Sequence, residues 1–272
     1  MYEEFKQLLE LTQERMEKIK YKIMIVSGKG GVGKSFIASS LAIATSLKGK
    51  KVGLLDADIH GPSIPKILGL ERQTIIVDNE GSIIPVKGPK GVSTLSIQYL
   101  LPSEDSPVIW RGPLKSRVIL EMLAKVNWGS LDYLYIDLPP GTGDEALSVA
   151  QYITQEAKAL IITMPSELSK LVVKKAVKFC YELRVPVIGV IENMRGFTCP
   201  KCGSYYNIFS GNAGEAIAKE EGIPYLGSIP IDPRISECID RGEPFILKYP
   251  NALAAKAIFK ICEEVINRVE GK

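Results

Sequence analysis

The octapeptide GKGGVGKS at positions 28–35 combines four glycines with two lysines and a serine. Small residues let consecutive backbone N–H groups converge on phosphate oxygens, and a following helix points the positive end of its dipole at them. Lys34 adds a positive charge, and Ser35 offers a hydroxyl to Mg²⁺. The octapeptide therefore predicts a site for a nucleoside triphosphate. The expected nucleotide-binding residues of this loop are Gly28, Lys29, Gly30, Gly31, Val32, Gly33, Lys34, Ser35 and Phe36.

Three aspartates stand where apolar runs end: Asp56 and Asp58 in LLDADIHGPS, and Asp137 in YIDLPPGTGD. Ligands bind at strand ends in parallel sheets, and phosphoryl transfer to water needs Mg²⁺ and a carboxylate that positions the water. We expect Asp137 on the magnesium side with Ser35, and Asp58 beside the attacking water. Asp56 could take either role or only hold its loop. We interpret the single histidine, His60, as a loop residue rather than a general base.

A C-x-x-C pair, Cys199 and Cys202, presents two soft thiolates on a tight turn. Two ligands are too few for tetrahedral zinc or a [4Fe-4S] cluster, so a second pair must come from elsewhere, and a twofold dimer would supply it. Zinc could occupy the same four-thiolate site. No thioredoxin-type βαβ start precedes the pair, which argues against a redox role. Cys180, Cys238 and Cys262 lie in helical patterns and are expected to be small core residues.

Apolar runs without alternation predict strands that are covered on both faces, with helical periodicity between them. This alternation predicts an α/β fold, a doubly wound and mostly parallel sheet flanked by helices. Residues 74–91 break the rhythm and predict a hairpin insertion with its turn at 78–81. The expected strands are 22–27, 51–56, 92–96, 133–137, 159–164, 187–191 and 224–229. The expected helices, besides the one after the phosphate loop, are 113–125, 144–153, 167–183, 212–221 and 251–269.

At 272 residues with 46% hydrophobic composition, the chain can form one large domain. We expect an N-terminal amphipathic helix over residues 1–20 that packs on the domain, and a single domain over 21–272 with a metal-binding segment at 197–204. A net charge of +3 without a basic stripe does not indicate nucleic acid. The first twenty residues are too charged for a signal peptide, and no apolar run could span a membrane. A cytoplasmic protein is expected, and five cysteines argue against a disulfide framework.

Six strings occur in this order: GKGGVGKS, LLDADIHGPSIP, IWRGPLKSR, DLPPGTGDEALS, GVIENMRGFTCPKCG and GSIPIDPRI. Together they resemble the Mrp/ApbC family of P-loop ATPases, which carry iron-sulfur clusters and have the SIMIBI-class fold. Lys29 resembles the second lysine of the deviant Walker A motif in ParA, MinD and the nitrogenase iron protein. The resemblance implies that Lys29 reaches the phosphates of a partner subunit and acts in catalysis with Lys34 and Asp58. It also implies a slow ATPase that forms a homodimer and transfers clusters to apo-proteins.

The same resemblance implies that Asn193 and the turn from Pro230 through Asp232 to Pro233 contact the adenine. The chain departs from the family pattern at two positions, because Phe36 replaces a threonine and Ser166 replaces a glutamine. The N-terminal cysteine cluster of some relatives is absent, so no second cluster site is expected. Two alternatives stay open: a ParA/MinD-like positioning ATPase, and an ATPase dimer whose cysteines hold a structural zinc.

Overall fold

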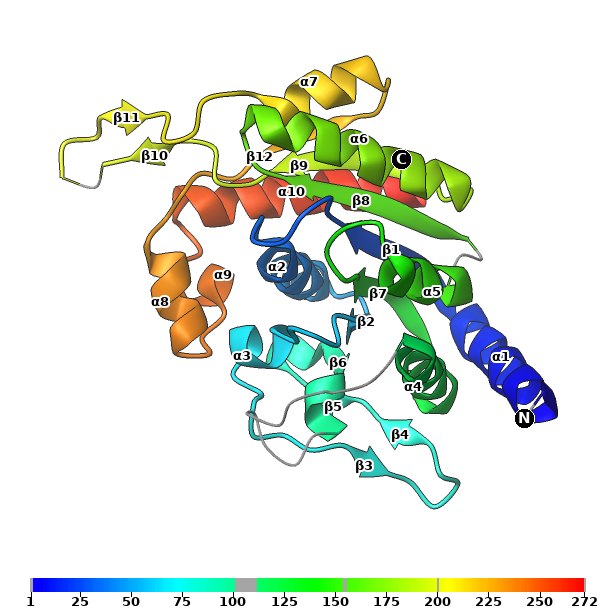
Figure 1. The fold of residues 1–272 in the computed structure, drawn as a ribbon. Helices are drawn as coiled ribbons and strands as arrows, with labels where there is room; N and C mark the ends of the chain where they lie inside the picture. Colours follow the sequence, from blue (N-terminus) through cyan, green and yellow to red (C-terminus); the bar gives the residue numbers. More distant parts are fainter. Residues whose placement is uncertain (1, 101–111, 154–155, 200, 272) are drawn as a thin grey trace.

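An eight-stranded sheet forms the centre of the protein, in the order β12-β9-β8-β1-β7-β2-β6-β5. The computed structural model describes residues 2–100, 112–153, 156–199 and 201–271 (Figure 1). Neighbouring strands of this sheet are parallel, except that β5 runs antiparallel to β6. The predicted doubly wound, mostly parallel sheet is confirmed. Its strands are β1 (Ile19–Val26), β2 (Val52–Asp56), β5 (Val86–Lys87), β6 (Ser93–Ser96), β7 (Leu131–Asp137), β8 (Ala157–Thr163), β9 (Val187–Glu192) and β12 (Tyr225–Ser228).

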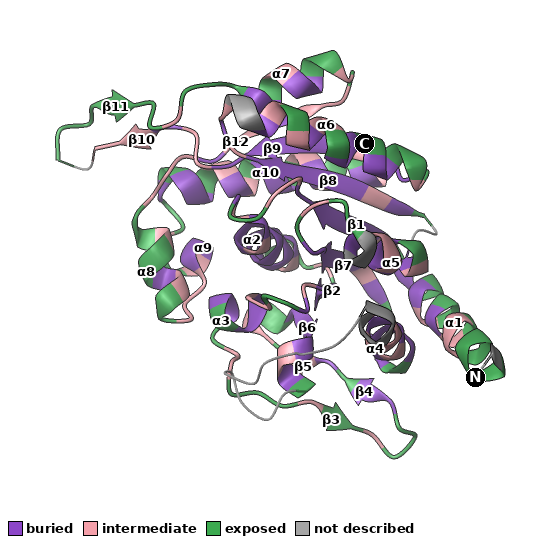
Figure 2. Ribbon diagram, in the orientation of Figure 1, coloured by how far each residue is buried: buried purple, intermediate pink, exposed green. Residues whose placement is uncertain are grey.

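Helices cover both faces of the sheet, so successive residues of a strand enter different cores (Figure 2). In β1, Ile23 and Ile25 pack with α2 and α10, whereas Met24 and Val26 pack with helices on the opposite face. The first face carries α2 (Lys34–Leu47), α3 (Ile64–Leu68), α8 (Arg234–Asp240), α9 (Phe245–Lys248) and α10 (Leu253–Glu270). The second carries α1 (Tyr2–Glu17), α4 (Gly112–Lys125), α5 (Asp144–Ile153), α6 (Glu167–Glu182) and α7 (Ala213–Glu220).

Most predicted elements are present within a few residues, and the differences have physical causes. The N-terminal helix ends at Glu17 rather than at residue 20, because Ile19 is buried and already pairs with Leu131 in the sheet. The helix packs on α4 and α5, as expected. Sequence analysis did not predict α3, α8, α9 or β5, because elements this short show no clear periodicity. Two further short elements are the 3-10 turns η1 (Pro89–Gly91) and η2 (Ile97–Leu100).

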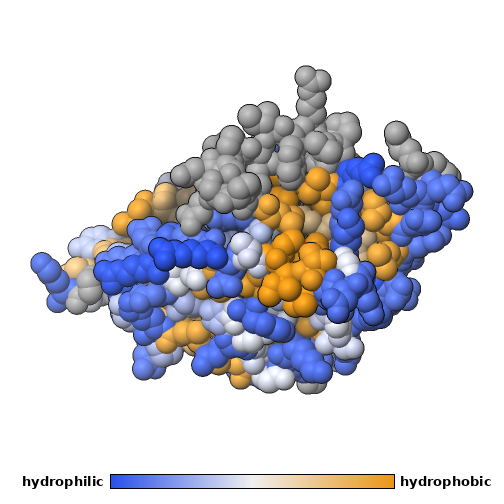
Figure 3. Space-filling model, turned by 90° about the horizontal axis from the view of Figure 1, so that it is seen from below, coloured by the Kyte–Doolittle hydropathy of each residue, from blue (hydrophilic) through white to orange (hydrophobic). Residues whose placement is uncertain are grey.

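The predicted hairpin insertion is confirmed as the antiparallel pair β3 (Ile76–Val77) and β4 (Ile83–Ile84). Seen from the side on which this hairpin lies, the surface shows a gathering of apolar side chains (Figure 3). Of the four strand residues, only Ile83 is buried. Ile76, Val77 and Ile84 therefore remain on the surface, with exposed fractions of 64%, 55% and 43%.

Cys180, Cys238 and Cys262 are buried in α6, α8 and α10, which confirms them as core residues. Ser166 caps α6 by accepting a hydrogen bond from the Ser169 N–H, a role that suits a hydroxyl. Among the described helices, none has the length and hydropathy that a membrane crossing requires. Two parts of the quoted strings lie outside the described residues: positions 109–111 of IWRGPLKSR, and Pro200 between the paired cysteines.

A buried carboxylate at the end of β9 joins three elements. Glu192 is 0% exposed, and its Oε1 accepts a hydrogen bond of 2.9 Å from the Gly214 N–H in the first turn of α7. Its Oε2 accepts from the Arg195 guanidinium and, at 3.4 Å, from the Tyr225 hydroxyl of β12. Burial of a carboxylate requires such partners, so this network fixes the strand end from which the next loop departs.

Replacement of Arg195 by methionine should lower the free energy of unfolding by about 2–4 kcal/mol, because the buried Glu192 loses its cationic partner. Urea denaturation measures the change. Arg268→Met, at an exposed arginine of α10, serves as the control and should cost under about 0.5 kcal/mol. Equal losses of unfolding free energy in the two variants would show that the Glu192 network does not stabilise the fold beyond an ordinary surface arginine.

Candidate functional site

The phosphate loop connects β1 to α2 at the carboxyl end of the central strand, which is where ligands bind in parallel sheets. Gly31 and Gly33 have φ angles of 77° and 81°, in the left-handed region that favours glycine. A Cβ at Gly33 would lie 2.3 Å from Asn193 Nδ2, so the loop needs glycine there for space as well. The loop lines a cavity of about 350 Å³ together with Asp58 and Lys66. The predicted loop residues from Lys29 to Phe36 therefore line one concave site, whereas Gly28 is packed against Val172 of α6.

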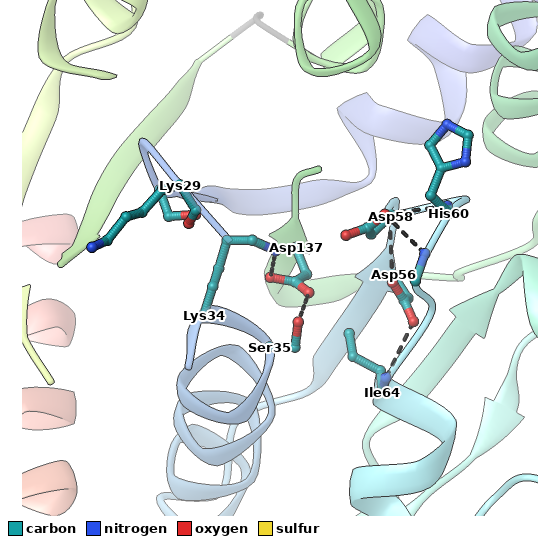
Figure 4. Close-up of polar contacts among 10 residues, drawn as sticks. Lys29, Lys34, Ser35, Asp56, Asp58, His60, Ile64 and Asp137 are labelled. Atoms are coloured by element: carbon teal, nitrogen blue, oxygen red, sulfur yellow. Dashed lines mark hydrogen bonds and ion pairs between the residues drawn. The ribbon is translucent and has the colours of Figure 1, made fainter. Parts of the chain in front are cut away.

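Lys34 and Ser35 line this cavity, and both contact the buried Asp137 behind it (Figure 4). Lys34 Nζ lies 2.6 Å from Asp137 Oδ1, and the Ser35 hydroxyl donates to Asp137 Oδ2 over 2.5 Å. Asp137 is 0% exposed. Burial raises the pKa of its carboxyl group, and the Lys34 charge and the Ser35 hydroxyl oppose that rise. A hydroxyl and a carboxylate are hard oxygen donors of the kind that Mg²⁺ prefers, so the predicted magnesium residues fit that ion.

Asp56 and Asp137 are neighbours in register on β2 and β7, as expected for strand ends at one edge of the sheet. Asp56 Oδ2 accepts hydrogen bonds from the Ile64 N–H at 3.2 Å and from the Ser96 hydroxyl at 3.1 Å. Burial, together with the nearby charge of Asp137, raises the pKa of Asp56 to about 8. These contacts support the loop-holding interpretation of Asp56 over direct contact with nucleotide, which stays a prediction.

Asp58 lies two residues after Asp56, in the loop that follows β2, and lines the phosphate cavity. Its Oδ1 accepts the backbone N–H groups of His60 and Gly61, each at 3.2 Å. Two backbone donors hold this carboxylate in place, which suits a group that orients water. The His60 side chain is exposed and points away from the carboxylates in Figure 4. This placement agrees with the interpretation of His60 as a loop residue.

The side chain of Lys29 is half-buried and points away from the Lys34–Asp137 contact (Figure 4). Its predicted reach toward a partner subunit remains a prediction. Phe36 is 6% exposed, and its ring packs edge-on against Phe245 with centroids 6.2 Å apart. The aromatic side chain therefore belongs to the core, while the residue still lines the cavity floor.

Residues that the sequence did not single out also line the phosphate cavity. Ser63, Lys66 and Ile67 follow Asp58 in DIHGPSIPKI. Their short distance in sequence from an expected catalytic carboxylate could have predicted that they lie near the nucleotide. Ile239 comes from α8, and no local pattern could have indicated it.

The predicted adenine contacts lie in two places. Asn193 is 4% exposed and donates from Nδ2 to the Val32 carbonyl of the phosphate loop over 2.9 Å. Pro230 and Asp232 line a second cavity, of about 400 Å³, together with Phe197. The structure thus gives Asn193 a role in holding the loop, and adenine recognition by these residues stays a prediction.

Cys199 and Cys202 lie on the turn of a small hairpin formed by β10 (Phe197–Thr198) and β11 (Tyr205–Tyr206), which projects from the body of the protein (Figure 1). The Cys199 N–H donates to the Ser204 carbonyl over 2.9 Å, which closes the turn. Cys199 is half-buried and Cys202 is exposed. Hydrogen bonding to the Ser204 hydroxyl lowers the pKa of the Cys202 thiol. Within the described parts of the chain, no group of three or more metal-ligating side chains occurs, so one subunit offers two thiols here.

The family model of ParA-type, NUBPL iron-transfer P-loop NTPases matches residues 18–266. A protein from Saccharolobus solfataricus named iron-sulfur cluster carrier protein is 50% identical over 258 residues, which are 95% of this chain and 87% of that protein. A protein of the same name from Methanocaldococcus jannaschii is 49% identical over 260 residues, 96% of this chain and 89% of that protein. These similarities confirm the family indicated by the six strings.

Solved structures that resemble this one include a nucleotide-bound relative and a cell division ATPase. A nucleotide-binding protein from Archaeoglobus fulgidus, in complex with ADP and with cobalt found, is 40% identical with a TM-score of 0.77, covering 87% of this chain and 92% of that one. The cell division ATPase MinD of Pyrococcus furiosus is 25% identical with a TM-score of 0.67, covering 91% of this chain and 99% of that one. The MinD-like P-loop fold is thereby confirmed.

Replacement of Lys34 by alanine should weaken ATP binding by about 100-fold, because a charge-assisted contact to phosphate is worth about 1.5–3 kcal/mol. Titration with a fluorescent nucleotide measures this. The control is Lys48→Ala, at an exposed pair with Glu263 just after the end of α2, which should bind as the parent does. Parent-like affinity in Lys34→Ala would remove Lys34 from the phosphate site.

Replacement of Asp58 by asparagine should lower the ATPase rate by about 100-fold, because the amide orients and polarises water less well than a carboxylate. ATP affinity should change by less than about threefold, since Asp58 is held by backbone N–H groups rather than by phosphate-binding side chains. Phosphate release and nucleotide titration, measured together, separate the two effects. An unchanged rate would assign water positioning to another group.

Proposed function

We propose, from the premise that this chain belongs to the NUBPL-type iron-transfer P-loop NTPases, that it is an ATP-hydrolysing carrier of iron-sulfur clusters. The observation that carries the proposal is the cysteine pair, half-buried Cys199 and exposed Cys202, on a projecting hairpin of a chain that also forms a phosphate-loop site. The relatives named iron-sulfur cluster carrier protein, which match almost the whole chain, support it. The cargo is a [4Fe-4S] cluster, and the recipients are apo-proteins in the cytoplasm.

Hydrolysis in this proposal relies on alignment and charge. The backbone N–H groups of the loop hold the phosphates, and Lys34 supplies a positive charge beside them. Ser35 and Asp137 would hold Mg²⁺, which neutralises phosphate charge when bound. Asp58 orients the water for attack. Because these groups lie on strand ends and on the first turn of α2, the sheet fixes their relative positions.

The cluster in this proposal lies between two copies of the chain. A [4Fe-4S] cluster takes four thiolates, and the cysteine hairpin offers two. A twofold axis through the site brings Cys199 and Cys202 of both copies together, so that each type of ligand occurs twice. Lys29, which points away from its own Asp137, would act on the nucleotide of the partner subunit.

Zinc fits the same four thiolates, and a dimer clipped by structural zinc is therefore the second candidate. The similarity in fold to MinD keeps a positioning ATPase as the third. The cysteine pair on the projecting hairpin favours the first two, because a positioning ATPase has no need for soft ligands. Iron and sulfide content after anaerobic reconstitution separates a cluster carrier from a zinc-clipped dimer.

The decisive test compares Cys199→Ser and Cys202→Ser with the parent protein, each reconstituted with iron and sulfide without oxygen. The parent should hold about one [4Fe-4S] cluster per dimer, and each serine variant should lose nearly all of it because one change removes two of four ligands. Metal and sulfide analysis with light scattering gives stoichiometry and mass together. Lys201→Ala, at the exposed residue beside Cys202, is the control and should keep the cluster.

The loaded parent should also be more dimeric than the metal-free parent, because metal that binds only the assembled pair shifts the equilibrium by mass action. A full cluster on a monomer, or on both serine variants, would contradict the shared site. Zinc without sulfide in every preparation would favour the zinc-clipped dimer.

A further inference from the structure

The residues between β9 and the cysteine hairpin connect the phosphate loop, the second cavity and the paired cysteines. We name residues 193–198 the connecting segment. It begins at Asn193 directly after β9 and ends at Thr198, next to Cys199. Each part of it contacts a different one of the three features.

The first contact is with the phosphate loop. Asn193 is held in the sheet by its N–H, which donates to the Thr163 carbonyl over 2.8 Å. Its side chain donates to the Val32 carbonyl over 2.9 Å and lies against Gly33. A change in the backbone of the loop at Val32 therefore acts directly on the start of the connecting segment.

The second contact is with the turn that follows β12. The Arg195 N–H donates to the Ile229 carbonyl over 2.9 Å, and the Ile231 N–H donates to the Gly196 carbonyl over 2.8 Å. Phe197 and Ile231 form an isolated parallel bridge. Phe197 and Thr198 also line the cavity of about 400 Å³ that residues Pro230–Arg234 line. A ligand in that cavity touches the turn and the connecting segment at once.

The backbone of the connecting segment is held in an unfavourable conformation. Met194 has a φ angle of 60° and Gly196 one of 71°, both in the left-handed region. For a residue with a side chain this costs about 1 kcal/mol, and it persists only where the surroundings impose it. The hydrogen bonds of Asn193 and Arg195, on either side of Met194, impose this conformation. Loss of either bond would let the backbone at Met194 return to a more favourable φ angle.

The third contact is with the cysteine hairpin. The ring of Tyr205 in β11 lies on Gly196, where a Cβ would meet Tyr205 Oη at 2.0 Å. Tyr205 also pairs in register with Thr198, the residue before Cys199. Tyr205 therefore holds the turn that carries both cysteines against the middle of the connecting segment.

We propose that this segment couples the two sites, so that nucleotide in the phosphate and second cavities tightens metal binding by Cys199 and Cys202. This inference rests on the proposed function. A nucleotide that fixes the loop and the Ile229–Pro233 turn also fixes the segment they hold, so metal that binds next has less chain to order. Linkage then requires that metal tighten nucleotide binding by the same factor. Tyr205 is the positioning residue of this coupling.

The test uses Co²⁺ as the probe, titrated without oxygen into the full-length protein in three states: without nucleotide, with Mg-ADP, and with a non-hydrolysable ATP analogue and Mg²⁺. The dissociation constant for Co²⁺ should fall at least about fivefold with nucleotide. The dissociation constant for ADP should fall by the same factor when Co²⁺ is present. Lys34→Ala, which cannot hold nucleotide well, should show no effect of added ADP.

Tyr205→Ala, compared with Tyr206→Ala, tests the route. The two tyrosines are adjacent in β11 and similarly exposed, at 57% and 52%, and Tyr205 is the one that lies on Gly196. In Tyr205→Ala the ratio of Co²⁺ affinities with and without nucleotide should approach one, and in Tyr206→Ala it should match the parent. A merely structural role for Tyr205 would weaken both affinities equally and leave the ratio unchanged, which would overturn the route.

A second readout separates this inference from the proposed function. If Co²⁺ binds with an affinity that nucleotide does not change, the coupling is wrong while the carrier function stands. If Co²⁺ binds in none of the three states, the tightening of metal binding is overturned, while reconstitution with iron and sulfide still decides the carrier function. If Co²⁺ binds, the rate of iodoacetamide alkylation of metal-free Cys199 and Cys202 checks the route: slower alkylation with Mg-ADP than without it would support the route, and equal rates would overturn it.

Discussion

The buried contact between Lys34 and Asp137 is the constraint on which the nucleotide site depends. A carboxylate with no exposed surface is tolerated at a strand end because an ammonium group lies 2.6 Å away. The parallel pairing of β1 with β7 creates this contact, because it places the end of β7 beside the start of the phosphate loop. Pairing of β2 on the other side of β7 adds Asp56 in register. Three parallel strands thus bring phosphate-binding and oxygen-donor groups to one edge of the sheet.

The protein separates hard and soft ligand chemistry in space. Hydroxyl and carboxylate oxygens lie at the sheet edge, where the backbone is fixed on both sides and the groups are buried. The two outer thiols lie on a small hairpin with exposed surface, where another molecule can reach them. A carrier has to release its cargo, and ligands on a projecting hairpin suit release better than ligands in a core. The three buried cysteines are the contrast, since burial raises the pKa of Cys180 to about 12 and that of Cys262 to about 11.

The fold alone does not distinguish a cluster carrier from a positioning ATPase, because MinD shares it. In this protein the segment between β9 and α7 holds the cysteine hairpin, which is the feature that favours a cluster carrier. That segment departs from the strand end fixed by Glu192 and turns back to pair with Ile231. The same stretch of chain therefore contacts the nucleotide side of the protein and carries the metal side, which is the physical basis for coupling them.

The sequence by itself determined the features that depend on local chemistry. GKGGVGKS requires small residues and a following helix whatever surrounds it, and unbroken apolar runs require strands with two covered faces. The family, the sheet, the hairpin insertion and the buried cysteines followed from such patterns. Only the tertiary structure decided which distant groups meet. The contacts of Asn193 with Val32, of Phe197 with Ile231 and of Ile239 with the phosphate cavity join residues far apart in the chain. Those contacts depend on how strands and loops pack, and local periodicity in the sequence does not predict packing. The raised pKa of Asp56 has the same origin, because it results from burial beside Asp137, and that burial exists only after the sheet has formed.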